Sequence, residues 1–62
     1  MPIVQIEMLE GRTVEQKRQM VVEVTEAITK NLNCPKEAVT IIIREMKREH
    51  LAKAGELAID KQ

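Results

Sequence analysis

The residue near the amino terminus with the clearest acid–base chemistry is Pro2, which follows Met1. Because proline is small, we expect methionine aminopeptidase to remove Met1 and expose the secondary amine of Pro2. That amine is mostly protonated at neutral pH, but an apolar pocket with neighbouring arginines disfavours the ammonium form. Such a pocket brings the pKa of the amine towards about 7, where a general base works best. The competing interpretation is that Pro2 simply begins an edge strand, where its missing N–H costs little.

Other catalytic groups are scarce in this chain. It contains no Ser, one His (His50) and one Cys (Cys34), and it has no phosphate-binding glycine loop. One Cys excludes an internal disulfide, and one Cys with one His cannot form a zinc site. We therefore expect no metal site, an inert Cys34 and a surface His50.

Three regular segments must position these groups. Apolar residues alternate over Ile3–Met8, which predicts a half-buried strand. Thr13 and Gln16 fit a capping box, so a helix is expected to begin there and to end before Pro35. The β-branched run Val39–Met46 predicts a second strand that is covered on both faces.

Two strands around one helix form a β-α-β unit, whose crossover is expected to be right-handed with parallel strands. The fold class is therefore α/β (α+β), in a single domain over residues 1–62. The remaining segment, Lys47–Gln62, is predicted to be a hairpin, a turn of helix or an arm on a neighbouring subunit.

Such a small domain without Phe, Trp or Tyr has little core of its own. Burial of apolar surface contributes about 90 kcal/mol at about 25 cal/mol per Å², and ordering the chain costs about the same. A two-stranded sheet with one helix also leaves one sheet face bare. Self-association is thus expected to supply the missing cover, and we predict an oligomer.

The charge pattern excludes several partners. Ten basic and ten acidic residues cancel, and no aromatic residue offers a stacking platform, so nucleic acid is not an expected partner. The amino terminus does not resemble a signal peptide, and no apolar run reaches membrane-spanning length. We expect a cytoplasmic protein that does not bind membranes.

Taken together, several segments resemble the 4-oxalocrotonate tautomerase family. The resemblance runs from Pro2 to about Leu57, and an amino-terminal Pro followed by Leu-Glu-Gly-Arg is quite specific in so short a chain. The segments that carry it are Pro2–Ile6, Leu9–Thr13, Glu15–Lys17, Val24–Ile28 and Ile42–Met46, with His50 and Ala54-Gly55 behind them.

The resemblance implies a tautomerase-type β-α-β subunit, commonly assembled as a homohexamer or another dimer-based oligomer with active sites at subunit boundaries. It implies an isomerase of aromatic-compound breakdown that needs no cofactor and acts on a small carboxylate such as 2-hydroxymuconate. By match, Pro2 is the catalytic base, Arg12 binds the distal carboxylate of the substrate, and the backbone of Leu9 lies in the pocket. An arginine suits that role because its fork grips a carboxylate bidentately.

Two positions depart from the family pattern. Thr40 stands where the family has a second-strand arginine, and Leu51 stands where it has an aromatic pocket wall. Losing such a donor can cost on the order of 10²–10³ in rate. Arg44 lies on the same strand face as Thr40, about 13 Å along the strand, and is expected to substitute in substrate binding only if the substrate sits differently. Lys47 and Arg48 are further candidates.

Three functions are consistent with these residues. The first is ketonisation of an enol or dienol by Pro2. The second is hydration or dehalogenation of an unsaturated acid, in which Pro2 serves as an acid. The third is a non-catalytic or partner-dependent subunit of a mixed oligomer, a possibility that Thr40 keeps open because another chain would then supply the missing arginine.

Overall fold

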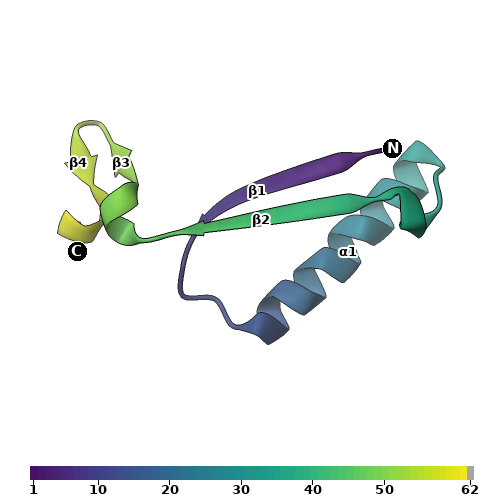
Figure 1. The fold of residues 1–62 in the computed structure, drawn as a ribbon, viewed down its shortest axis with the longest axis horizontal. Coiled ribbons are helices and arrows are strands. Elements are labelled where there is room, and N and C mark those ends of the chain that lie inside the picture. The colour runs from purple at the N-terminus through teal and green to yellow at the C-terminus, as the bar shows by residue number, and fades with distance from the viewer. Residues whose placement is uncertain (62) are drawn as a thin grey trace.

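The computed structural model describes residues 1–61; Gln62, the last residue of the predicted domain, lies outside the described residues. A long helix and two long strands make up the body of the subunit, and a small hairpin extends from one end (Figure 1). Short 3-10 turns join these elements. In chain order the elements are β1 (Ile3–Leu9), α1 (Val14–Leu32), η1 (Lys36–Ala38), β2 (Thr40–Met46), η2 (Arg48–His50), β3 (Ala52–Lys53), β4 (Glu56–Leu57) and η3 (Ala58–Asp60).

The ends of α1 form as the sequence predicts. The Gln16 N–H donates to Thr13 Oγ1 at 3.1 Å, and the Thr13 N–H donates to Gln16 Oε1 at 2.9 Å, which completes the capping box. Asn33 ends the helix in the left-handed conformation, with φ 54°. The capping box fixes where the helix starts, and therefore where the preceding loop with Arg12 must lie.

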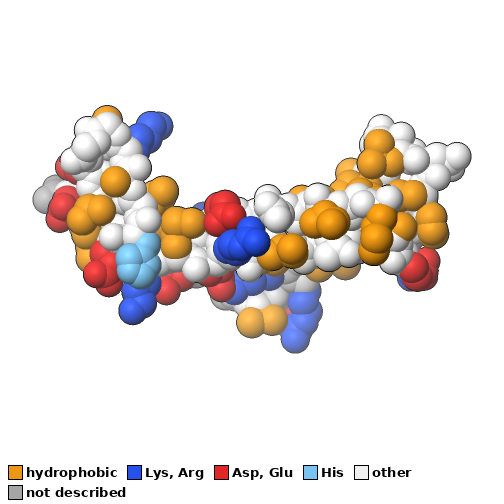
Figure 2. All heavy atoms as spheres, turned by 45° about the horizontal axis from the view of Figure 1, so that its top comes forward, with side chains coloured by type: hydrophobic (Ala, Val, Ile, Leu, Met, Phe, Trp, Pro, Cys, Tyr) orange, Lys and Arg blue, Asp and Glu red, His pale blue; other side chains and the backbone are white. Residues whose placement is uncertain are grey.

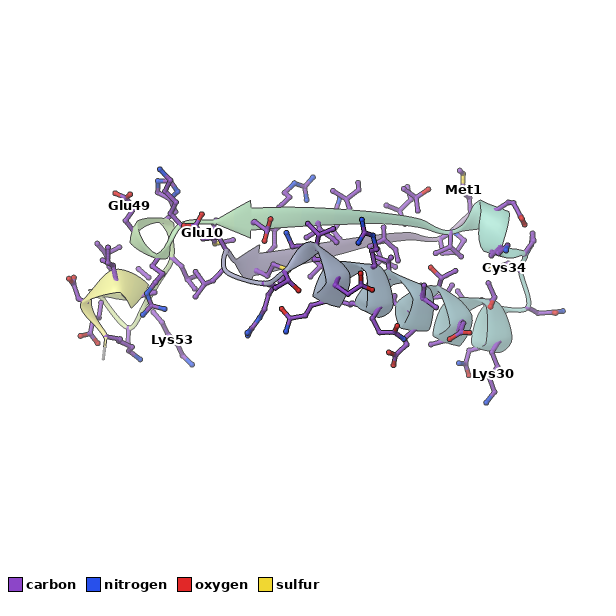
Figure 3. The ribbon with its side chains drawn as sticks, turned by 90° about the horizontal axis from the view of Figure 1, so that it is seen from below. Met1, Glu10, Lys30, Cys34, Glu49 and Lys53 are labelled. Carbon is purple, nitrogen blue, oxygen red and sulfur yellow. The ribbon has the colours of Figure 1, made fainter. Side chains whose placement is uncertain are left out.

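Strands β1 and β2 are parallel, as predicted, and pair from Ile3 with Thr40 to Leu9 with Met46. Paired residues of neighbouring strands point to the same face, so this register divides the side chains into two sets. One set faces α1, which lies on one side of the two strands (Figure 3). On this side Lys17 of α1 forms an ion pair with Glu45 of β2, with Nζ 2.7 Å from Oε1. The helix-facing set consists of Val4, Ile6, Met8, Ile41, Ile43 and Glu45.

No element of residues 1–61 covers the opposite face of the sheet. We call it the open sheet face; its members are Ile3, Gln5, Glu7, Leu9, Thr40, Ile42, Arg44 and Met46. Ile3 is 60% exposed, and hydrophobic side chains lie along the strands in this view (Figure 2). A single helix covers only one face of β2, as expected, and the cover expected from a neighbouring subunit on the other face stays a prediction.

No side chain of residues 1–61 is fully buried. The accessible surface is 5140 Å², whereas a compact monomer of 7.1 kDa exposes about 4,100 Å². The radius of gyration is 14.8 Å, compared with about 10.6 Å for a compact domain of this length. The chain is thus elongated and exposes more surface than a compact domain of its length.

The carboxy-terminal segment is a hairpin, one of the three predicted forms. Strands β3 and β4 pair antiparallel, and Gly55 takes a positive φ of 81° in the turn. The Ala58 N–H donates to Leu51 O at 2.8 Å, which ties the hairpin to the turn before it. The hairpin lies beyond the carboxyl ends of β1 and β2, away from α1 (Figure 1). No helix in residues 1–61 is long and apolar enough to cross a membrane.

Candidate active site

Pro2 lies at the start of the sheet, one residue before β1. The Thr40 N–H donates to Pro2 O at 3.1 Å, so the first bond of the sheet holds the backbone of Pro2. Pro2 is half-buried, whereas Met1 is 91% exposed. This exposure leaves the Met1–Pro2 peptide bond accessible to an aminopeptidase, while the prolyl residue itself stays anchored.

Arg12 and Leu9 lie at the other end of the sheet, where they share a pocket. This pocket, which we call the arginine pocket, has a volume of about 400 Å³ and is lined by Met8, Leu9, Glu10, Gly11, Arg12 and Arg48. A cavity of about 230 Å³ adjoins it on the helix side of Arg12, lined by Met8, Arg12, Gln16, Lys17 and Met20. The structure therefore brings two of the expected site residues together and adds cationic neighbours.

Pro2 and Arg12 are not neighbours within one subunit. They flank opposite ends of β1, which spans seven residues from Ile3 to Leu9. At about 3.3 Å per residue, the two positions lie about 20 Å apart along the sheet. A small substrate cannot contact both residues in one copy of the chain, so a site that uses both requires two copies.

Arg44, the expected substitute for the missing arginine, already has a partner. Its Nη1 lies 3.2 Å from Glu7 Oε2, and both side chains are about half exposed on the open sheet face. Thr40 is on the same face but pairs with Ile3, four positions from the pairing of Glu7 with Arg44. The structure thus places Thr40 next to Pro2 at the start of β2. Arg44 lies four residues further along β2, in an ion pair with Glu7.

Leu51 lines neither the arginine pocket nor the cavity beside Arg12. It is 41% exposed and lines a cavity of about 140 Å³ in the hairpin, together with Lys53, Glu56, Ala58 and Lys61. Among the described residues, no three His, Cys, Asp or Glu side chains lie close enough together to hold a metal ion.

Two side chains beside Arg12 were not predicted as site residues from the sequence. Lys17 reaches the Arg12 cavity from the first turns of α1, and Glu10 lines the arginine pocket from the loop. Lys17 is held there by Glu45, which is 28 residues away in the sequence. The packing of α1 against the sheet brings these two residues together, and no local spacing in the sequence signals it.

The same fold and sequence pattern occur in known proteins. A family model described as "Tautomerase enzyme" matches residues 2–61. A 2-hydroxymuconate tautomerase of Pseudomonas putida is 50% identical over 58 residues, which is 94% of this chain and 92% of its own length. A 2-hydroxymuconate tautomerase of Bacillus subtilis is 45% identical over 60 residues, which is 97% of either chain.

Solved structures agree in fold. The crystal structure of YwhB, a homologue of 4-oxalocrotonate tautomerase, matches with a TM-score of 0.93 at 43% identity, over 98% of this chain and 100% of that one. A heterohexamer 4-oxalocrotonate tautomerase from Chloroflexus aurantiacus matches with a TM-score of 0.93 at 29% identity, over 100% of both chains. Such agreement over the full length covers Pro2, both strands and the hairpin.

Proposed function

The chain belongs to the tautomerase family, and from this we propose that it converts enol or dienol forms of small 2-oxo acids, 2-hydroxymuconate among them, into the conjugated ketones. The observation that carries the proposal is the family match, which begins at Pro2 and ends at Lys61. The relatives named 2-hydroxymuconate tautomerase support this substrate class.

In the proposed mechanism, removal of Met1 leaves Pro2 with a secondary amine. In its neutral form the amine nitrogen takes the proton from the 2-hydroxyl group of the dienol. It then returns a proton to a carbon further along the conjugated chain. A C–H bond forms, the double bonds shift, the enol C–O becomes a carbonyl, and the amine is neutral again. No electrons leave the substrate, so the reaction as written needs no cofactor.

The proposed active site combines two subunits. Pro2 of one subunit would lie near Arg12 of another, because the two residues are about 20 Å apart within one chain. The bare open sheet face and the surplus of about 1,000 Å² of exposed surface support a dimer-based oligomer, and we propose a homohexamer. We also propose that the enzyme acts in the cytoplasm, in the breakdown of aromatic compounds.

The mass and the activity of the mature chain test this function. We expect intact-protein mass spectrometry to show loss of Met1, and the purified protein to ketonise 2-hydroxymuconate. Pro2→Ala should lose nearly all activity. An amino-terminal extension should do the same, because it turns the Pro2 nitrogen into a non-basic amide. Full activity in either variant contradicts a Pro2 base.

A second candidate is a subunit that acts only within a mixed oligomer. Thr40 beside Pro2, where the family arginine is missing, favours it, as does the heterohexamer that this chain resembles in fold. Native mass spectrometry and activity of the chain expressed alone decide between the two candidates. An active homo-oligomer supports the first candidate. Activity that appears only after a homologous second chain is added supports the second.

A further inference from the structure

We propose that Arg48 is a substrate-binding residue that acts together with Arg12 to select dicarboxylates. The inference rests on the proposed tautomerase function and gives it a specificity determinant. It assigns to Arg48, rather than to Arg44, the additional positive charge of the site. The occupant of the arginine pocket is then the distal carboxylate of the substrate.

The strand register explains why Arg12 and Arg48 meet. Leu9 pairs with Met46 at the carboxyl ends of β1 and β2, and the Glu10 N–H donates to Met46 O at 2.9 Å. The chain therefore leaves both parallel strands at the same edge of the sheet. Arg12 follows three residues after the end of β1, and Arg48 follows two residues after the end of β2. Both side chains line the arginine pocket.

The guanidinium group of Arg48 is held in place from behind. Its Nη2 donates to Ala58 O at 2.6 Å and lies 3.5 Å from Lys61 O. A guanidinium carries five N–H donors, and these contacts occupy at most the two on Nη2. Within residues 1–61, Nε and Nη1 have no hydrogen-bond partner. A planar fork that is already fixed on one side loses little entropy when its other side binds a carboxylate.

The arginine pocket has a surplus of positive charge. Arg12 and Arg48 carry two positive charges, while Glu10 is its one acidic residue and forms no ion pair with either arginine among the described contacts. A carboxylate between the two guanidinium groups relieves their repulsion and gains charge-assisted hydrogen bonds.

The other arginines are engaged elsewhere. Arg44 pairs with Glu7 at 3.2 Å on the open sheet face, and Arg18 pairs with Glu15 at 3.0 Å on the exposed side of α1. Neither lines the arginine pocket or the cavity beside Arg12. Arg48 is thus the arginine that the structure places with Arg12.

The test compares a dicarboxylate with a monocarboxylate. The probes are 2-hydroxymuconate and 2-hydroxypenta-2,4-dienoate, whose kcat/KM values are measured for the wild type, Arg48→Gln, Arg48→Lys and Arg12→Gln. Arg18→Gln is the matched control, because it removes the same charge at an exposed site that lines neither the arginine pocket nor the cavity beside it. Calorimetric titration with muconate, which has two carboxylates but no enol, measures binding without turnover.

Arg48→Gln should lower kcat/KM about tenfold or more for the dicarboxylate and leave the monocarboxylate nearly unchanged, because a hydrogen bond to a charged group is lost. Muconate should bind correspondingly more weakly. Arg48→Lys should also lower the preference, because an ammonium cannot bind a carboxylate and hold Ala58 O in the same fork geometry. If Arg48→Gln does not fold, the proposal is tested by Arg48→Lys, through its ratio of kcat/KM for the dicarboxylate to kcat/KM for the monocarboxylate.

Equal losses for both substrates, with unchanged muconate binding, mean that Arg48 only holds the 58–61 segment, and this result overturns the proposal. An unchanged substrate ratio overturns it as well. In either case, the tautomerase function is still supported if the wild-type ketonisation activity is lost in Pro2→Ala. A wild-type chain that is inactive on both substrates, both alone and after a homologous second chain is added, overturns both proposals together.

Discussion

Thr40 occupies the position nearest to Pro2 on the second strand, through the 3.1 Å bond from its N–H to Pro2 O. Its short hydroxyl side chain carries no charge to stabilise an oxyanion that develops on the substrate. Within residues 1–61 of one subunit, no other arginine lies at that end of the sheet, since Arg44 is paired with Glu7 and Arg48 lies at the opposite end. We therefore expect this chain to be slow on 2-hydroxymuconate.

Thr40→Arg should increase kcat/KM for 2-hydroxymuconate by about 10- to 100-fold, because a cation directed at developing oxyanion charge contributes on that scale. Thr40 is exposed within the single subunit and is the first residue of β2, at the end of the open sheet face and not near its middle. Thr40→Val serves as the control, since it changes the residue without adding charge. If the arginine variant is no faster than the valine variant, the missing charge at Thr40 does not limit the rate.

The positions of individual site residues could be read from the sequence, but their grouping could not. Leu9 and Arg12 lie on one short loop, so their proximity follows from chain connectivity. The ion pair of Arg44 with Glu7 and the meeting of Arg12 with Arg48 depend on the pairing of Leu9 with Met46. That register is set by packing across 37 residues of chain, and no local pattern reports it.

At the scale of elements, the loop that carries Arg12 is fixed by the start of α1. Thr13 and Gln16 form the capping box directly after Arg12. Thr13→Ala should lower the free energy of unfolding by about 1 kcal/mol and raise KM for a dicarboxylate, because the helix start frays beside Arg12. Thermal unfolding at fixed protein concentration and steady-state kinetics measure the two effects.

Thr29→Ala is the matched control, because the Thr29 hydroxyl only donates back to Glu26 O within the helix. It should change the free energy of unfolding by no more than a few tenths of a kcal/mol and leave KM nearly unchanged. Equal effects of the two substitutions would show that the cap does not organise the loop.

The ion pair of Lys17 with Glu45 connects α1 to β2. Its atoms lie 2.7 Å apart, and its side chains are 24% and 32% exposed, compared with 68% and 79% for the pair of Arg18 with Glu15. A double-mutant cycle of Lys17→Met and Glu45→Gln should give a coupling free energy of about 0.5–1 kcal/mol that weakens with added salt. The Arg18 and Glu15 cycle should give a smaller value, and the reverse order would contradict the role assigned to Lys17.

The elements themselves are well specified by local chemistry. Alternation predicts the first strand to within one residue of its end at Leu9, and the capping residues predict the helix start. The sequence does not distinguish a hairpin, a turn of helix or an arm for the carboxy-terminal segment, because its apolar groups are too short to show a period. The turn at Gly55 decides for a hairpin.

At the scale of the whole molecule, the absence of buried side chains in residues 1–61 supports the proposed oligomer, in which folding and association are one process. Ile42 is an apolar residue near the middle of the open sheet face. Ile42→Lys should dissociate the oligomer and abolish activity, because a buried, unpaired ammonium is strongly unfavourable. Size-exclusion chromatography with light scattering, together with the ketonisation assay, checks both effects.

Asn31→Lys is the control for this substitution. It adds the same charge at an exposed position in the last turn of α1, where a cation interacts favourably with the helix dipole. An Ile42→Lys protein that keeps the wild-type mass and activity would show that the open sheet face is not an interface.

The most direct test of the central claim is the pH dependence of kcat/KM for ketonisation by mature protein that lacks Met1. If the neutral amine of Pro2 is the base, activity rises with pH through the pKa of that amine, because the amine must lose its proton before it can accept one from the enol. The account predicts that this limb lies near neutrality and disappears in Pro2→Ala. A Pro2→Ala enzyme with the same limb and comparable activity would contradict it.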